Sequence, residues 1–243
     1  MKQALVTGAS RGIGEAISLR LLEEGFKVTG TARISAFPKT LSEHDHFRGV
    51  HVDLSEPSDL QTKLKPLFEN DCPDVLINNA GISTDADFSS SDEKWLNVWD
   101  RTIQVNLRSA SLICKWFLNA RDREKAEGII INIASRAAYR GDTQEYAAYA
   151  ASKGGMVAFT KSIARDFSRK GIVAFSIAPG FVDTDMAKEG VLVYGQDYLT
   201  QGSAFDQITP PSEIANMVAF LARGDVKHMS GSTFHINGGS YMI

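Results

Sequence analysis

Short hydrophobic runs alternate along this chain with longer segments in which apolar residues recur at helical spacing. The strand-like runs are residues 4–8, 27–32, 49–53, 74–81, 128–135, 172–180 and 232–238. The helix-like segments are residues 12–25, 57–70, 91–126, 146–171 and 210–224. Strands buried on both faces have continuous hydrophobic sequences, and two parallel strands are usually connected by a helix. The alternation therefore predicts an α/β fold, a doubly wound parallel sheet of about seven strands with helices on both faces.

The length and composition of the chain fit one large domain. With 243 residues, of which 43% are hydrophobic, the chain can bury a full core, so we expect a single Rossmann-type domain over residues 1–243. Residues 184–211 form a long segment without clear periodicity. Such a segment inside a compact domain is usually a lid or a binding loop. We expect a flexible substrate flap there, which carries Tyr194, Tyr198 and Phe205.

Charge and cysteine content argue against several classes of protein. The net charge of −3 and the pI near 6.0 give no electrostatic reason to expect nucleic acid or a membrane as the main partner. Cys72 and Cys114 provide neither a disulfide framework nor the spacing of a metal site, so we expect no metal. No apolar run reaches the roughly 20 residues that cross a bilayer. These features are typical of a soluble cytoplasmic protein.

A glycine-rich turn follows the first strand. The sequence TGASRGIG places Gly8, Gly12 and Gly14 between the first strand and the first helix. Glycines at this point allow a tight turn and a close approach of the backbone to a pyrophosphate, which then lies at the helix N-terminus. The spacing GxxxGxG differs from the GxGxxG fingerprint, but the strand–turn–helix context is the one that a dinucleotide site requires. The turn therefore predicts dinucleotide binding.

The end of the second strand indicates which dinucleotide is bound. A NAD site normally has Asp or Glu there, which holds the ribose 2′-hydroxyl. This chain has Ala32 followed by Arg33, and a second cation, Arg11, lies within the glycine turn. Arginine forms paired hydrogen bonds with phosphate, so the two arginines favour the 2′-phosphate of NADP(H). The alternative is that both are ordinary solvated charges.

Two tyrosines precede a lysine at the start of the helix expected at 146–171. Tyr149 and Lys153 are four residues apart, which places them one turn apart on the same face. Tyr146 is two turns from Lys153, about 10 Å along the axis, so it packs elsewhere or precedes the first turn. A nearby ammonium lowers the pKa of a phenol from about 10 and favours proton transfer near neutral pH. The pair predicts that Tyr149 protonates a carbonyl oxygen during hydride transfer.

Two further polar residues support this chemistry. Ser135 ends the fifth strand-like run, and open α/β sheets bind ligands at the carboxyl ends of their strands. Its hydroxyl can therefore orient a substrate oxygen toward Tyr149. Asn106 lies within an otherwise apolar stripe of the segment 91–126. It is either a helix asparagine with satisfied hydrogen bonds or part of a helix irregularity that holds a water between Lys153 and solvent.

Together these features resemble the short-chain dehydrogenase/reductase family over nearly the whole chain. The resemblance rests on TGASRGIG, NNAG at 78–81, Asn106, Ser135, YAASK at 149–153 and APG at 178–180. It implies a catalytic tetrad of Asn106, Ser135, Tyr149 and Lys153, and a homotetramer built partly on the helices that carry Asn106 and Tyr149. It also implies that Asp53 contacts the adenine and that Asn79 steadies the sheet beside the cofactor. The cofactor-binding residues expected from the motifs and the resemblance are Gly8, Ser10, Arg11, Gly12, Ile13, Gly14, Arg33, Asp53, Leu54, Asn79, Ala80, Gly81, Tyr149, Lys153, Pro179, Gly180, Val182 and Thr184.

Within this family, the two arginines, the short N-terminus and the C-terminal HINGGSYMI resemble the bacterial 3-oxoacyl-acyl-carrier-protein reductases. The resemblance implies NADPH-dependent reduction of the 3-oxo group of an acyl thioester in fatty-acid biosynthesis. It also implies acyl carrier protein, which is acidic, as a partner that docks on basic residues near the mouth of the site. The candidates for docking are Arg121, Arg123, Lys125, Arg169 and Lys170, and the alternative for each is a solvated charge.

Other functions stay open. The connection between Ser135 and Tyr149 is one residue longer than expected for these reductases, and it carries the charged residues Arg136, Arg140, Asp142 and Glu145. This polar connection leaves a reductase or dehydrogenase for another small ketone, sugar or secondary alcohol as an alternative. A noncatalytic NADP(H)-binding sensor is an alternative of another class, although a sensor does not need the full Asn, Ser, Tyr and Lys set. A methyltransferase would leave the Tyr–Lys pair unexplained.

Overall fold

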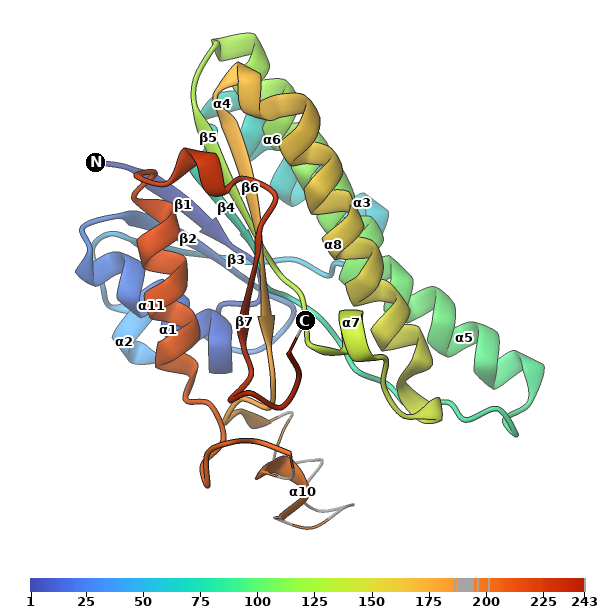
Figure 1. Ribbon diagram of the computed structural model, residues 1–243. Helices are drawn as coiled ribbons and strands as arrows, with labels where there is room; N and C mark the ends of the chain where they lie inside the picture. The colour runs from blue at the N-terminus through green and yellow to red at the C-terminus, as the bar shows by residue number, and fades with distance from the viewer. Residues whose placement is uncertain (186, 188–194, 196, 201, 243) are drawn as a thin grey trace.

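The computed structural model describes residues 1–185, 187, 195, 197–200 and 202–242. It contains a sheet of seven parallel strands in the order β3-β2-β1-β4-β5-β6-β7 (Figure 1). The strands are β1 (Gln3–Val6), β2 (Lys27–Ala32), β3 (Phe47–His51), β4 (Val75–Asn78), β5 (Gly128–Ile133), β6 (Ile172–Pro179) and β7 (Thr233–Ile236). The expected doubly wound parallel sheet is confirmed. Its strand order reverses between β1 and β4, which is where such sheets bind ligands, at the carboxyl ends of the strands.

Helices cover both faces of the sheet, as the alternating pattern predicts (Figure 1). The helices α1 (Gly12–Glu23) and α11 (Pro211–Ala222) pack against each other on one face. The other face is covered by α4 (Lys65–Asn70), α6 (Ser109–Glu124) and α8 (Ala147–Phe167). Each face has its own hydrophobic cluster, with Ile17 and Ile214 in one and Phe68 and Phe117 in the other. Burial of these two clusters holds the sheet between its helices.

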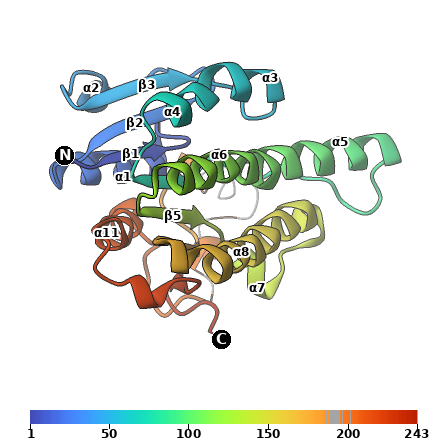
Figure 2. The same ribbon diagram turned by 90° about the horizontal axis from the view of Figure 1, so that it is seen from above.

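The segment expected as one long helix at 91–126 has a break in its centre. It forms α5 (Asp92–Ile103), a π-helical turn over Gln104–Arg108, and then α6. The side chain of Ser91 caps α5 by accepting a hydrogen bond from Lys94 N at 3.3 Å. Figure 2 shows α5 extending beyond the sheet, beside the N-terminal part of α8. Short π-helical turns inside α-helices occur often at functional sites, and this one carries Asn106.

Shorter elements complete the described part of the chain. They are α2 (Lys39–Ser42), α3 (Pro57–Asp59), a π-helical turn over Leu60–Leu64, α7 (Ala137–Arg140), α10 (Asp197–Thr200) and the 3₁₀ turns Gln144–Tyr146, Ser168–Lys170 and Lys227–Met229. Two contacts join the expected flap to the residues just before it: Val182 pairs with Thr209, and the rings of Phe181 and Tyr198 lie 5.5 Å apart. Residues 186, 188–194, 196 and 201, Tyr194 among them, lie outside the described residues. No helix in the described ranges is long and apolar enough to cross a membrane.

Candidate functional site

The glycine turn between β1 and α1 leaves room for a ligand at the backbone. Gly8 and Gly12 have φ angles of 69° and 57°, which side chains other than hydrogen disfavour. A Cβ on Gly14 would lie 2.0 Å from Gly8 O, so the turn closes tightly onto the helix only with glycine there. The first N–H groups of α1 have no partners within the helix and can bind an anion. The turn therefore has the shape and the donors of a pyrophosphate site.

The ends of β1 and β4 are tied together beside this turn. Asn79 Nδ2 donates hydrogen bonds to Thr7 O at 2.9 Å and Gly8 O at 3.1 Å. Thr7 Oγ1 accepts hydrogen bonds from Asn79 N and Ala80 N, both at 3.0 Å. These bonds match the steadying role expected for Asn79. Thr7 is not among the site residues predicted from the sequence, although its place as the first residue of TGASRGIG could have singled it out.

Arg33 and Asp53 lie near each other at the carboxyl ends of β2 and β3. Asp53 Oδ1 accepts hydrogen bonds from Ser55 N at 2.9 Å and Ser55 Oγ at 2.6 Å. Burial raises the pKa of Asp53, but these bonds and the charges of Arg33 and Arg101 outweigh it, so the net pKa is lowered. The structure thus brings together the residues expected at the adenine and at the 2′-phosphate. Arg33 itself is exposed.

Arg11 lies at the N-terminus of α1 and faces the start of the flap. Its Nη1 is 3.6 Å from Asp185 Oδ2, and the two side chains are 70% and 59% exposed. An ion pair this exposed contributes little stability, so the guanidinium can exchange Asp185 for another anion. A Cβ on Gly12 would lie 3.0 Å from Thr184 Cγ2, so Thr184 adjoins the glycine turn as expected.

The APG segment continues β6 toward the same edge of the sheet. Gly180 N donates to Ile236 O at 2.9 Å, and a Cβ on Gly180 would lie 2.9 Å from Asn237 Cα. Val182 is buried, and its carbonyl accepts a hydrogen bond from Thr184 Oγ1 at 3.2 Å. Pro179, Gly180, Val182 and Thr184 therefore form one continuous wall between β6 and the glycine turn.

The remaining cofactor-binding positions line the same edge. Leu54 is buried, and its carbonyl accepts a hydrogen bond from Gln104 Nε2 at 3.4 Å. Ser10 is half-buried in the glycine turn, whereas the side chain of Ile13 packs on the hydrophobic core. Ala80 also packs on the core. Ile13 and Ala80 can therefore contact a dinucleotide mainly through their backbone.

Tyr149, Lys153 and Ser135 meet at the carboxyl end of β5. Tyr149 and Lys153 lie on α8, with Lys153 Nζ 5.8 Å from the centre of the Tyr149 ring. Lys153 is buried and its Nζ donates a hydrogen bond to Ile133 O at 2.8 Å. The side chains of Ser135 and Tyr149 are hydrogen-bonded to each other. Tyr146 lies in the 3₁₀ turn before α8, which confirms that Tyr149 is the neighbour of the lysine.

The pKa of Tyr149 differs from the value expected from the sequence. Burial raises the pKa of Tyr149, and the charge of Asp142 adds to this, while the hydrogen bond with Ser135 acts in the opposite direction. Burial also lowers the pKa of Lys153 from 10.5 to about 8. The expectation that the ammonium lowers the Tyr149 pKa is therefore wrong for the chain itself. The reason is that both groups are removed from water, which favours their neutral forms.

Asn106 is held at the π-helical turn by a complete set of hydrogen bonds. Its Oδ1 accepts from Ile82 N at 2.8 Å, and its Nδ2 donates to Ile82 O at 2.9 Å and to Ser152 Oγ at 3.0 Å. The helix irregularity expected at this position is confirmed. The asparagine is also satisfied, as the alternative expects, and the water between Lys153 and solvent stays a prediction. A Cβ on Gly81 would lie 3.3 Å from both Asn106 Oδ1 and Lys153 Nζ, so these three residues adjoin.

The basic residues expected at the mouth of the site lie elsewhere within the chain. Arg121 is buried and donates hydrogen bonds to Cys72 O, Pro73 O and Asp74, so it is a structural residue. Arg123 and Lys125 end α6 just before β5, and Arg169 and Lys170 precede β6. All five cations thus lie at the amino-terminal edge of the sheet, opposite Ser135. The prediction that these cations lie near the mouth of the site is therefore wrong for a single chain.

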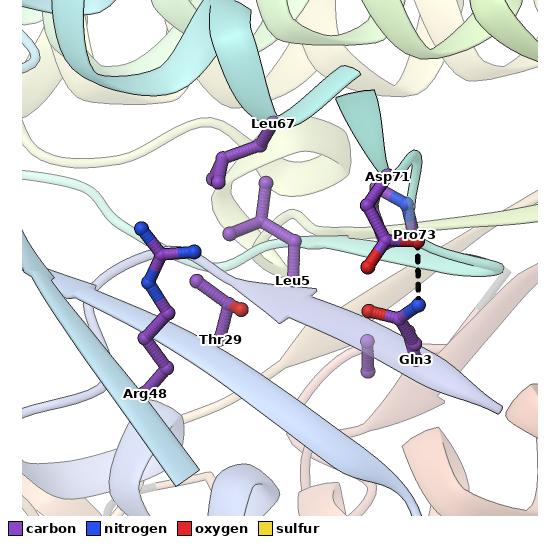
Figure 3. Close-up of a pocket in the computed structure, with 8 residues that line it drawn as sticks. Gln3, Leu5, Thr29, Arg48, Leu67, Asp71 and Pro73 are labelled. Atoms are coloured by element: carbon purple, nitrogen blue, oxygen red, sulfur yellow. Dashed lines mark hydrogen bonds between the residues drawn. The ribbon is translucent and has the colours of Figure 1, made fainter. Parts of the chain in front are cut away.

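A pocket near this opposite edge contains none of the expected site residues (Figure 3). It lies between β1, β2, β3 and α4, and its lining includes Leu5, Arg48 and Leu67. Gln3 Nε2 closes one side by donating a hydrogen bond to Asp71 Oδ1 at 2.8 Å. The chemistry-bearing residues gather at the other end of the strands.

The fold and this arrangement of residues define a nucleotide-dependent α/β protein, and comparison with known proteins gives its family. A family model described as short chain dehydrogenase matches residues 2–191. The 3-oxoacyl-[acyl-carrier-protein] reductase FabG of Vibrio cholerae serotype O1 is 38% identical over 245 residues, covering 100% of this chain and 98% of that protein. The chain belongs to the short-chain dehydrogenase family. It is an oxidoreductase that acts on CH–OH or C=O groups.

Solved structures with the same architecture bind nicotinamide dinucleotides. One is provisionally assigned as a 2-deoxy-D-gluconate 3-dehydrogenase from Agrobacterium tumefaciens and contains bound NADP; it has a TM-score of 0.88, 27% identity, and coverage of 98% of this chain and 96% of that chain. Another is a 4-hydroxyisoleucine dehydrogenase complexed with NADH and succinate, with a TM-score of 0.85, 27% identity and 98% coverage of both chains. The glycine cradle and the adjoining Gly81 of the present chain fit a dinucleotide of this kind.

Proposed function

We propose that the protein is an NADPH-dependent reductase that reduces the 3-oxo group of an acyl thioester. The full-length similarity to a 3-oxoacyl-[acyl-carrier-protein] reductase carries this proposal. The meeting of Ser135, Tyr149 and Lys153 at the carboxyl end of β5 supports it, because a carbonyl reductase needs a proton donor next to its substrate site.

The glycine turn would hold the pyrophosphate of the cofactor, and Arg33 with Arg11 would bind the 2′-phosphate. When bound, the nicotinamide supplies the hydride. Asp53 and Leu54 would flank the adenine, and the wall from Pro179 to Thr184 would position the nicotinamide end. Gly81 leaves room beside Lys153 for the ribose, because any side chain at residue 81 would crowd the Lys153 ammonium.

Tyr149 would act as the general acid. Its raised pKa keeps the phenol protonated near neutral pH, so a proton is available for the carbonyl oxygen. Ser135 would hold that oxygen next to the phenol, and the Lys153 ammonium would stabilise the phenolate once the proton has left. Asn106 fixes the backbone of Ile82 and the hydroxyl of Ser152 behind this centre. It would thereby keep α5 and α8 in register.

The decisive experiment measures cofactor oxidation with an acetoacetyl thioester, comparing NADPH with NADH. Rapid turnover that is selective for NADPH is the expected result. If the protein binds NADPH but does not reduce the thioester, the substrate assignment is wrong. If NADH serves equally well, the cofactor assignment is wrong.

Substitution of Arg33 tests whether this residue binds the 2′-phosphate of NADPH. Arg33→Ala should weaken NADPH binding by about 10-fold or more, because a charge-assisted hydrogen bond contributes roughly 1.5–3 kcal/mol. NADH binding should stay nearly unchanged, since NADH has no phosphate at this position. Titration of both cofactors by fluorescence checks this. An equal loss for both would remove Arg33 from phosphate recognition.

A second candidate is a dehydrogenase for a small hydroxy acid. The two structural neighbours described above take their names from 2-deoxygluconate and 4-hydroxyisoleucine, both of which carry a carboxylate. The specific observation in this chain is the buried Arg136 directly after Ser135. NADP⁺ reduction with a panel of hydroxy acids tests this candidate.

A further inference from the structure

Arg136 occupies an unusual place for an arginine. It follows Ser135 directly, and its backbone N donates a hydrogen bond to Pro179 O at 2.9 Å, which fixes it between the ends of β5 and β6. The residue is only 7% exposed. Its guanidinium stacks over the ring of Phe181, 4.3 Å from the ring centre, and Nη1 donates to Ser240 Oγ near the C-terminus. The side chain therefore lies between the segment that follows β6 and the C-terminal segment, directly after the residue expected to hold the substrate oxygen.

In the part of the chain that the structure describes, little offsets the charge of this guanidinium. Within the described ranges, no carboxylate lies within ion-pair distance of Arg136, and Nη1 to Ser240 is the hydrogen bond that its side chain donates. The neighbouring groups that act on its charge are Arg140, which is positive, Asp142, which is exposed, and Tyr198, which like Asp142 favours the charged guanidinium. Burial lowers the pKa of Arg136, and Arg140 lowers it further. A buried cation is normally paired, because removing it from water is unfavourable without a counter-charge.

We propose that Arg136 binds a carboxylate of the substrate, so that the substrate class is an oxo compound carrying a carboxylate close to its reacting carbonyl. The planar guanidinium offers a fork of donors that matches the two oxygens of a carboxylate, and the stacking on Phe181 holds this fork in one orientation. Ser135, which would hold the carbonyl oxygen, is the preceding residue, and adjacent Cα atoms are about 3.8 Å apart. With Ser135 holding the carbonyl oxygen, the proposal places the carboxylate within a few carbons of the carbonyl.

This inference rests on the proposed function and narrows its substrate. For a thioester, the acyl chain would end in a carboxylate instead of a methyl group. The matched pair is the 3-oxohexanoyl and the 3-oxoadipyl thioester of N-acetylcysteamine, which have the same chain length and differ at the distal end. The wild-type kcat/KM should favour the 3-oxoadipyl thioester by about 10-fold or more, the worth of one charge-assisted hydrogen bond.

Three variants assign that preference to Arg136. Arg136→Met keeps the length and apolar stem of the side chain and should abolish the preference, mainly through KM, while leaving the 3-oxohexanoyl thioester within about threefold. Arg136→Lys restores the charge without the fork and should recover part of the preference. Arg165→Met removes an exposed arginine from α8 and should behave as wild type. NADPH titration of each variant reports a folded cofactor site. If the wild type reduces the thioesters without this preference, or if Arg136→Met keeps the preference, the proposal is overturned.

A binding measurement separates this inference from the thioester assignment. Levulinate and 2-pentanone, a carboxylate-bearing ketone and its uncharged counterpart, are titrated into the enzyme–NADPH complex by calorimetry. Levulinate should bind the wild type and the Arg165→Met variant equally and should bind Arg136→Met about 10-fold more weakly. If this result holds while both thioesters are inert, the thioester assignment is wrong and the carboxylate assignment stands. If levulinate binds no better than 2-pentanone, the carboxylate assignment is wrong whatever the thioesters do.

Discussion

At Tyr149 and Lys153 the chain holds an acid and a base whose neutral forms are both favoured by burial. The pKa of the phenol is raised from 10.0 and that of the ammonium is lowered from 10.5 to about 8, so the two values move apart. The phenol therefore keeps its proton near neutral pH, where it is available for a substrate oxygen. The hydrogen bond from Lys153 to Ile133 O holds the amine on the strand that ends at Ser135.

The Tyr149→Phe variant tests the proposed general acid. Loss of the hydroxyl should reduce kcat by roughly 10²- to 10⁴-fold, the usual contribution of a positioned acid. NADPH affinity should stay within about a factor of two, because the ring is retained. Steady-state kinetics and a fluorescence titration check the two parts. Turnover close to the wild-type rate would assign the proton transfer to another group.

The lowered pKa of Lys153 has a consequence for stability. The amine titrates near pH 8 in the folded chain and near 10.5 when unfolded, so between these values the unfolded chain binds more protons. The free energy of unfolding therefore rises with pH in this window and is lowered by a constant amount below it. Relative to Lys153→Met, the wild type should gain about 1 kcal/mol between pH 7 and pH 9. Urea unfolding at several pH values measures this difference, and parallel profiles for the two proteins would contradict it.

At the scale of elements, the turns that connect strands to helices build most of the site. The β1–α1 turn requires glycine at residue 14 because the first turn of the helix packs on Gly8 O. The π-helical turn between α5 and α6 places Asn106 where it bonds both backbone groups of Ile82. Neither requirement comes from the chemistry of a reaction. Both come from packing one element closely against the next.

Two glycine substitutions test whether close packing, and not the change to alanine as such, makes glycine necessary at residue 14. Gly14→Ala places a Cβ 2.0 Å from Gly8 O and should destabilise the turn by about 1–3 kcal/mol or more, with loss of NADPH binding. The control is Gly154→Ala in α8, where the nearest contact is Ala138 O at 3.7 Å. That change should raise stability by about 0.5–1 kcal/mol, because alanine favours the helix. Thermal unfolding and NADPH titration compare them, and equal effects would refute the packing argument.

At the scale of the whole molecule, the two edges of the sheet have different tasks. The carboxyl edge collects the glycine turn, Ser135, Tyr149 and the wall after β6, whereas the opposite edge is closed by structural contacts. Arg121 is the clearest of these contacts, since it joins α6 to the segment before β4 through Cys72 O, Pro73 O and Asp74. Stability and substrate chemistry are therefore separable in this protein.

Arg121→Met should test that separation. Removing the guanidinium leaves buried acceptors without donors and should cost about 2–4 kcal/mol of unfolding free energy. Reduction of a small thioester should be unchanged in the folded protein. Arg123→Met removes an exposed cation two residues further along α6. It should lower the free energy of unfolding by less than about 1 kcal/mol. Chemical denaturation with parallel kinetics measures both. If Arg121→Met has normal stability but slower turnover, Arg121 acts in substrate binding and its assignment as a structural residue is wrong.

Local patterns in the sequence determined a large part of this protein. Hydrophobic runs gave the strands, although β3 lies at Phe47–His51, two residues before the expected position. The spacing of four residues placed Tyr149 and Lys153 on one helix face, and the glycines of TGASRGIG marked the turn after β1. These features are local, because helix and strand periodicity and glycine turns depend on neighbouring residues. The catalytic and cofactor-binding roles of the residues stay predictions.

The tertiary structure alone decided which charged residues are buried and what they contact. Arg121 looked like a surface cation, but it is held by residues about 50 positions earlier, and Arg136 bonds Ser240, 104 positions later. The Tyr149 pKa moved opposite to its expected direction, because burial outweighs the hydrogen bond with Ser135. Burial and long-range contacts depend on how distant elements pack, and no local pattern encodes that. The sequence therefore determined the positions of strands, turns and candidate groups, and the packing of the elements decided their charge environment.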